Sequence, residues 1–193
     1  MIEIPEHIKA LIFDCDGTLV DSMPLHMEAW EYSLIKFGVP FDHEFFFSRK
    51  GMKGIEIVEE YNSKFNAELD IEKIIAVKHE YFQNNSHAIK PIGIVADVAV
   101  SYHNILPMAV ASGGSKKNVI TSLKVTGLEK YFPTILTADD SVKPKPSPDI
   151  FLEAARLMNI EPQYCQVFED GDLGLEAARS AGMLATDVRL FLD

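Results

Sequence analysis

Short, largely apolar runs recur along the chain, and longer segments with helical periodicity separate most of them. The runs cover Ala10–Phe13, Met108–Ala111, Thr134–Thr137, Cys165–Phe168 and Met183–Val188. Unbroken apolar character indicates strands that are covered on both faces, as in parallel sheets. Helical patterns between them span Lys116–Thr126, Pro148–Met158 and Asp172–Ala181. The alternation of strand and helix predicts an α/β fold with a Rossmann-like, doubly wound parallel sheet.

The segment after the first strand departs from this alternation. It is typical of successive helices, at His26–Phe37, Lys53–Phe65 and Ile71–Gln83. Ligands of doubly wound sheets bind at the carboxyl edge of the strands, and lids over such sites exclude water. We therefore predict an α/β core of residues 1–20 and 87–193, and an all-helical cap of residues 21–86 inserted after the first strand. Inside the cap, we expect the Phe45-Phe46-Phe47 run to belong to the hydrophobic core and Trp30 to form packing contacts.

The composition limits the partners of the chain. Its 193 residues suit one domain or a core with a modest insertion, and a hydrophobic content of 47% permits a substantial core. The formal net charge of -11 repels nucleic acid and anionic membranes, so we expect neither as a partner. This charge also repels phosphorylated ligands, so a phosphate site would need local cations.

Cysteine usage and hydropathy predict the compartment. The two cysteines, Cys15 and Cys165, cannot build a disulfide framework, and we expect both in the core of a reduced protein. No apolar stretch approaches the roughly 20 residues of a membrane span, and the first residues are unlike a secretory signal. We predict a cytoplasmic protein. The sequence does not give the oligomeric state, and a monomer is our working expectation.

Four groups of polar residues follow predicted strands or lie in the loops after them. Asp14 and Asp16 end the first strand and precede Gly17, which permits a tight turn. The other groups are Ser112-Gly113, Lys145 and Glu169-Asp170. Taken alone, each group is also typical of a polar strand end, a turn or a solvated loop. A calcium loop starting at Asp14 is excluded because Leu25 occupies the position that requires an acid.

Taken together and in this order, the four groups resemble the haloacid dehalogenase superfamily. The helical insertion and the Phe168-Glu169-Asp170 sequence resemble its β-phosphoglucomutase-like subfamily. The short C-terminal segment Asp187–Phe191 is most similar to compact bacterial sugar-phosphate phosphatases of the fructose-1-phosphatase type. The resemblance implies a Mg²⁺-dependent phosphatase that hydrolyses a small phosphorylated sugar or similar metabolite through an aspartyl-phosphate intermediate.

The resemblance also implies catalytic roles. Asp14 would be the nucleophile, and Asp16 would protonate the leaving group and then deprotonate the attacking water. Because the first of these steps needs a protonated carboxyl group, we expect an environment that raises the pKa of Asp16. Lys145 would neutralise the crowded carboxylates and the phosphate. Ser112, with Gly113 and nearby backbone amides, would hold the phosphate oxygens.

The metal ligands implied by the resemblance are oxygens, as Mg²⁺ prefers. They are the Asp14 carboxylate, the Asp16 backbone carbonyl and Asp170, while Glu169 would bind the metal or a metal-bound water. The family often has serine after the acidic pair, but Gly171 and then Asp172 stand here. How the loop that contains Glu169 and Asp170 is held in place therefore stays open.

Several lysines and one histidine are candidates for contact with substrate. Lys143 competes with Lys145, but Lys145 directly precedes Pro146 and the following helix. His26 lies in the hinge where the subfamily's mutase has a functional histidine. In the cap, Lys50 and Lys53 flank a glycine, and Lys78 is a similar case on a later helix; a solvated surface position explains each of them equally well.

Three rival functions remain at this stage. A β-phosphoglucomutase-type phosphohexomutase shares all four groups and differs only in the fate of the aspartyl-phosphate. A non-catalytic sugar-phosphate-binding protein is a second rival, although the intact Asp14 and Asp16 argue against it. A dehalogenase is the weakest rival because it needs no Mg²⁺ and normally lacks the second aspartate.

Overall fold

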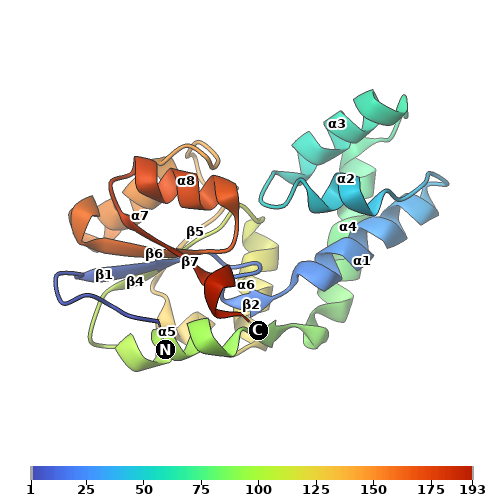
Figure 1. Cartoon of the computed structure of the whole chain (residues 1–193). Helices are drawn as coiled ribbons and strands as arrows, with labels where there is room; N and C mark the ends of the chain where they lie inside the picture. Colours follow the sequence, from blue (N-terminus) through green and yellow to red (C-terminus); the bar gives the residue numbers. More distant parts are fainter. Residues whose placement is uncertain (1, 193) are drawn as a thin grey trace.

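The protein, described for residues 2–192 by a computed structural model, has a layered part built on a parallel sheet and a group of helices beside it (Figure 1). The five-stranded sheet has the order β5-β4-β1-β6-β7, and all its neighbouring strands are parallel. The strands are β1 (Ala10–Phe13), β4 (Met108–Ala111), β5 (Thr134–Leu136), β6 (Cys165–Glu169) and β7 (Leu184–Asp187). All five lie where the apolar runs predict them.

The central position of β1 explains how its acidic end meets distant segments. Phe13, the last residue of β1, pairs with Val110 of β4 on one side and with Phe168 of β6 on the other. The strands run parallel, so the residues that follow these three positions emerge at the same edge of the sheet. Residues 14–16, 112–114 and 169–171 are therefore neighbours in space.

Helices cover both faces of the sheet (Figure 1). The helices α5 (Gly93–Tyr102) and α6 (Lys116–Val125) share a hydrophobic cluster with one face of β1, whereas α7 (Asp149–Met158) and α8 (Asp172–Ser180) share a cluster with the other. The doubly wound α/β fold is thereby confirmed. The sequence patterns predicted α6, α7 and α8 to within one residue at each end but missed α5.

The remaining helices form a separate group beside the sheet layers (Figure 1). They are α1 (Met23–Lys36), α2 (His43–Phe47), α3 (Gly54–Phe65) and α4 (Ile71–Asn85). Trp30, Phe45 and Phe46 are buried in a hydrophobic cluster of their own with residues of α3 and α4. The expectation that Phe47 belongs to this core is wrong: Phe47 is 49% exposed, because the short helix α2 buries only the side that carries Phe45 and Phe46.

A two-stranded antiparallel ribbon joins the two parts. Its strands are β2 (Val20–Asp21) and β3 (Lys90–Pro91), too short for any sequence pattern to reveal. The chain thus enters and leaves the helical group at neighbouring points, and we keep residues 21–86 as the proposed cap. Short 3-10 turns complete the fold at Ser86–Ala88, Glu129–Tyr131, Pro162–Tyr164 and Val188–Phe191.

Both cysteines are unpaired and buried, as expected from their flanking sequence. Within residues 2–192, no helix combines the length and the apolar character that crossing a membrane requires.

Candidate active site

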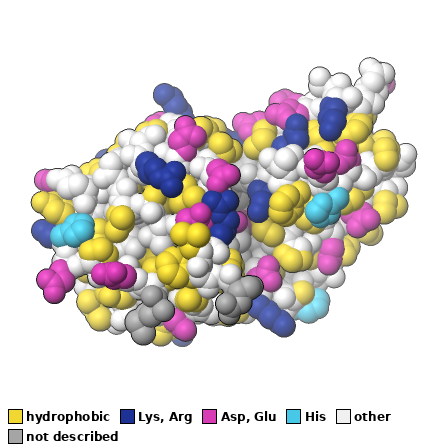
Figure 2. All heavy atoms as spheres, viewed as in Figure 1, with side chains coloured by type: hydrophobic (Ala, Val, Ile, Leu, Met, Phe, Trp, Pro, Cys, Tyr) yellow, Lys and Arg dark blue, Asp and Glu magenta, His cyan; other side chains and the backbone are white. Residues whose placement is uncertain are grey.

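A cleft of about 700 Å³ lies between the carboxyl edge of the sheet and the proposed cap. Figure 2 shows basic and acidic side chains mixed around the hollow between the two parts. The cleft is lined by all the site residues predicted from the sequence: Asp14, Asp16, His26, Lys50, Lys53, Ser112, Gly113, Lys145, Glu169 and Asp170. Segments far apart in the chain therefore converge on one site, and their chemical roles remain predictions.

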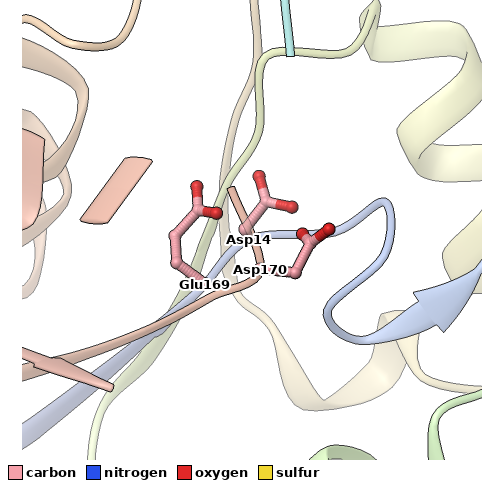
Figure 3. A group of neighbouring side chains, drawn as sticks. All are labelled: Asp14, Glu169 and Asp170. Carbon is pink, nitrogen blue, oxygen red and sulfur yellow. The ribbon is translucent and has the colours of Figure 1, made fainter. Parts of the chain in front are cut away.

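Three carboxylates that line the cleft lie side by side (Figure 3). Asp14 follows β1, Glu169 ends β6 and Asp170 follows it, and one oxygen from each lies within 4.8 Å of the others. A set of hard oxygen donors suits a hard divalent cation such as Mg²⁺. The side chain of Asp16 is outside this set, so only its backbone carbonyl stays a candidate ligand.

Lys145 provides the positive charge nearest to these carboxylates. Its ammonium group donates to Asp14 Oδ1 at 2.7 Å and also to Glu169 Oε1. The Lys145 side chain is only 7% exposed, and its two acidic partners raise its pKa against the effect of burial. Lys143, the competing candidate, is exposed. Lys145, and not Lys143, therefore contacts Asp14 and Glu169.

The electrostatics of Asp14 favour a bound cation. Burial raises the pKa of Asp14 well above its ordinary value, and the charges of Glu169 and Asp170 add to this effect, while Lys145 opposes it. Burial and Glu169 likewise raise the pKa of Asp170. A divalent cation among these groups would favour their charged forms, because an opposite charge at such short range lowers a carboxyl pKa.

Small residues and hydroxyl groups hold the acidic side chains in place. Thr18 donates to Asp170 Oδ1 at 3.0 Å, and the Gly171 N–H donates to Glu169 Oε2 at 2.9 Å. A Cβ on Gly17 would lie 2.5 Å from Asp170 Oδ2, and Gly17 also has a φ of +88°. Glycine is therefore required at position 17 by both space and backbone conformation.

The Asp16 side chain lies outside the carboxylate cluster and contacts residues of the proposed cap. Its Oδ1 accepts a hydrogen bond from Ser22 at 2.5 Å and lies 3.3 Å from His26 Nε2. Burial alone would raise the pKa of Asp16, but His26, Ser22 and Lys78 outweigh burial, and the net pKa is lowered. The expectation of a raised pKa at Asp16 is therefore wrong for this arrangement of the site.

His26 links Asp16 to a buried lysine of the cap. Lys78 Nζ lies 3.0 Å from His26 Nδ1, and burial lowers the pKa of Lys78 to about 8. Burial and Lys78 also lower the pKa of His26, so its ring is neutral at neutral pH. A neutral ring that accepts from Lys78 through Nδ1 donates to Asp16 through Nε2. Lys78 is thus buried in the site and does not lie on a solvated helix face.

The loop after β4 brings a hydroxyl group and backbone amides to the cleft. Ser112 is buried, and its Oγ accepts from the Gly114 N–H at 3.0 Å. Gly113 lies close to the loop between α2 and α3, which we call the cap loop: a Cβ at position 113 would lie 2.5 Å from Gly51 O. The two loops therefore touch through backbone atoms at this edge of the cleft.

The cap lysines differ in their surroundings. Lys50 Nζ lies 3.9 Å from Asp170 Oδ2, so it approaches the carboxylate cluster. Lys53 precedes α3 and lines the cleft. Thr18 and Ser22 contact the acidic side chains of the site, and sequence analysis assigned no role to either; the signal for both was their presence as hydroxyls in the same loop as Asp14 and Asp16.

Comparisons with known proteins agree with this geometry. A family model described as haloacid dehalogenase-like hydrolase matches residues 11–188. Fructose-1-phosphate phosphatase of Escherichia coli strain K12 is 37% identical over 186 residues, which are 96% of this chain and 98% of that protein. β-Phosphoglucomutase of Bacillus subtilis strain 168 is 28% identical over 193 residues, covering 94% of this chain and 83% of that protein.

The fold is also similar to solved structures. The crystal structure of CbbY from Rhodobacter sphaeroides in complex with phosphate matches with a TM-score of 0.82 and 27% sequence identity, and the match covers 92% of this chain and 84% of that chain. The family match spans both the acidic loop after β1 and the acidic pair that ends β6. This chain belongs to the haloacid dehalogenase-like hydrolase family.

Proposed function

We propose that the protein is a Mg²⁺-dependent phosphatase that hydrolyses a small phosphorylated sugar or similar metabolite through an aspartyl-phosphate on Asp14. The observation that carries this proposal is the buried contact of Lys145 with both Asp14 and Glu169 in the cleft. A buried carboxylate beside an ammonium group and two further acids suits attack on a phosphate only if a cation offsets the negative charge. Mg²⁺ held by Asp14, Glu169, Asp170 and the Asp16 carbonyl would supply that charge.

In the first step, an Asp14 oxygen forms a bond to phosphorus while the bond from phosphorus to the leaving oxygen breaks. Asp16 gives its proton to the leaving alkoxide. In the second step, water attacks phosphorus, Asp16 takes a proton from that water, and the bond between phosphorus and Asp14 breaks. Lys145 and Ser112 hold the phosphate oxygens during both steps, together with backbone N–H groups of the loops after β1 and β4.

The lowered pKa of Asp16 adds a requirement to the first step. Asp16 must gain a proton before it can donate one. A dianionic phosphate bound next to Asp16 adds a like charge, and a like charge raises the pKa of a carboxyl group. Binding of the substrate would thus move Asp16 toward the protonated form that the reaction needs.

Residues 21–86 would act as a cap that contacts the rest of the substrate through His26, Lys50 and Lys53. Closure of such a cap excludes bulk water from the reacting groups. The named relatives act on fructose 1-phosphate or interconvert phosphoglucose, which supports a small phosphorylated carbohydrate as substrate. With a net charge of -11, the chain is poorly suited to bind nucleic acid or an anionic membrane. A cytoplasmic monomer remains our prediction.

The second candidate is a phosphohexomutase. The contact between His26 and Asp16 suits a phosphohexomutase as well as a phosphatase. Incubation of the protein with Mg²⁺ and a panel of sugar phosphates separates the two. We expect free phosphate to appear and a chelator to stop its release. Isomerised sugar phosphate without free phosphate would establish the mutase instead, and turnover that persists in the chelator would remove Mg²⁺ from the proposal.

A further inference from the structure

The C-terminal segment that follows β7 reaches back to the acidic loop of the site. Arg189 lies in the turn Val188–Phe191 and forms a two-pronged contact with Asp187, from Nε to Oδ1 at 2.8 Å and from Nη2 to Oδ2 at 2.7 Å. The same Nη2 also donates to Asp172 Oδ1 at 2.8 Å. One guanidinium group therefore joins two carboxylates from different elements.

The positions of these carboxylates place the contact across the metal loop, which we define as residues 169–171. Asp187 ends β7 and is the register partner of Glu169 at the end of β6. Asp172 is the first residue of α8. Arg189 thus connects the strand beside the start of the loop to the helix that begins where the loop ends.

The metal loop lacks the side-chain anchor that a serine at position 171 would supply. Gly171 is the N-cap residue of α8, and no side chain caps this helix. Glycine has the greatest backbone freedom of all residues, so ordering it costs the most entropy. The contacts of Arg189 with Asp172 and Asp187 tie the first residue of α8, which directly follows this glycine, to the end of β7.

We propose that Arg189 is a positioning residue, which clamps the metal loop between β7 and α8 and so raises the affinity of the site for Mg²⁺. The clamp rests on the proposed function, because it assumes that Asp170 and Glu169 hold the ion. Arg189 does not contact these two carboxylates in the structure and acts on them through Asp172 and Asp187.

The sign of the effect separates a clamp from a simple charge. Arg189 lines the same cleft as the carboxylate cluster. Removal of a positive charge near a cation site should tighten cation binding by Coulomb attraction alone. Loss of a clamp should weaken binding, because the ligands must then be ordered when the ion binds. The side chains of Arg189 and Asp172 are 46% and 84% exposed, so their pair adds little to the stability of the fold.

Calorimetric titration of the full chain with MgCl₂ tests the clamp. We expect Arg189→Ala to raise the dissociation constant for Mg²⁺ about two- to fivefold. Arg189→Lys keeps the charge but loses the planar fork, so we expect it to stay weaker than wild type. Arg156→Ala is the matched control, since Arg156 forms a comparable exposed pair with Glu153 on α7. The affinity of this control variant for Mg²⁺ should equal that of wild type.

The outcomes are distinguishable. Mg²⁺ affinity of Arg189→Ala equal to or tighter than wild type would overturn the clamp, and so would wild-type affinity in Arg189→Lys. If Arg189→Ala melts at a much lower temperature than the Arg156→Ala control, Arg189 supports the whole fold and the clamp is also overturned. A wild-type protein that binds no Mg²⁺ would overturn the metal assignment of the proposed function together with the clamp.

Discussion

The ammonium group of Lys145 lies 2.7 Å from Asp14 Oδ1, although 131 residues separate the two in sequence. Both side chains are 10% exposed or less, and Lys145 also contacts the buried Glu169. A buried charge is tolerated only when it is paired and hydrogen-bonded. Lys145 therefore neutralises part of the negative charge of the two buried carboxylates that it contacts, and under the proposed function it would also bind the phosphate.

Replacement of Lys145 by Met should destabilise the metal-free protein by about 3–5 kcal/mol at pH 7, because two buried carboxylates lose their counter-charge. The loss should be smaller at pH 5. Burial already raises the pKa of Asp14, and without Lys145 this pKa rises further above that of the unfolded chain, so protonation of Asp14 at lower pH relieves the penalty. Urea unfolding in a chelator at both pH values measures the difference.

Lys143→Met is the matched control for this variant, since Lys143 lies in the same loop and is exposed. Its free energy of unfolding should stay within about 0.5 kcal/mol of wild type. Equal effects of the two variants would show that the buried contact of Lys145 carries no special weight.

Lys78 gives a prediction about pH. Burial lowers the pKa of Lys78 from 10.5 to about 8. Between these pH values the unfolded chain binds more protons than the folded protein, so stability should rise with pH in this window. Lys78→Met lacks this group and should show a flatter profile and, below pH 8, a free energy of unfolding higher by up to about 3 kcal/mol. Its activity should nevertheless fall, because His26 loses its partner.

Unfolding curves between pH 7 and pH 10 check the stability side of this prediction, and phosphate release at pH 7 checks the activity side. Lys116→Met removes an exposed lysine and controls for the general change of charge. Parallel pH profiles for wild type and Lys78→Met would contradict the assignment of a buried, titrating lysine.

Gly113 allows the cap loop to touch the core. An alanine at this position should push Gly51 away, since a Cβ would lie 2.5 Å from Gly51 O. We expect kcat/KM to fall by about tenfold or more because the cleft no longer closes fully over the substrate. Gly93→Ala is the control, because nothing lies within 4 Å of its added Cβ. That control should retain wild-type activity.

The single tryptophan gives this prediction a second readout. Trp30 lines the cleft, so a cap held open should make its fluorescence easier to quench by acrylamide. Gly113→Ala with unchanged quenching and unchanged kcat/KM would show that the approach of the two loops has no part in closure.

The sheet and the acidic edge could be predicted because both leave local signals. The strands β1 and β6 consist of four and five consecutive buried residues, most of them apolar, and the acids lie at or directly after the end of each. α5 left a weaker signal: its apolar residues form a run that suits a buried strand as well as a buried helix. The ribbon of β2 and β3 has two residues in each strand, which is too few for any periodicity.

The electrostatics of the site could not be predicted, because they depend on contacts between distant segments. The pKa of Asp16 is lowered by side chains from α1 and α4, including Lys78, 62 positions along the chain from it. Sequence alone leaves Lys78 open between a contact with substrate and a solvated position on its helix. Only the fold reveals that its ammonium group is buried beside His26.

The most direct test of the account is the release of inorganic phosphate by Asp14→Asn in saturating Mg²⁺, with the panel substrate that wild type hydrolyses fastest. Asparagine keeps the size of the side chain but cannot form the aspartyl-phosphate. We predict a fall in kcat of at least about 10³-fold, with a melting temperature no lower than that of wild type. Phosphate release within tenfold of wild type by a folded Asp14→Asn protein would contradict Asp14 as the nucleophile.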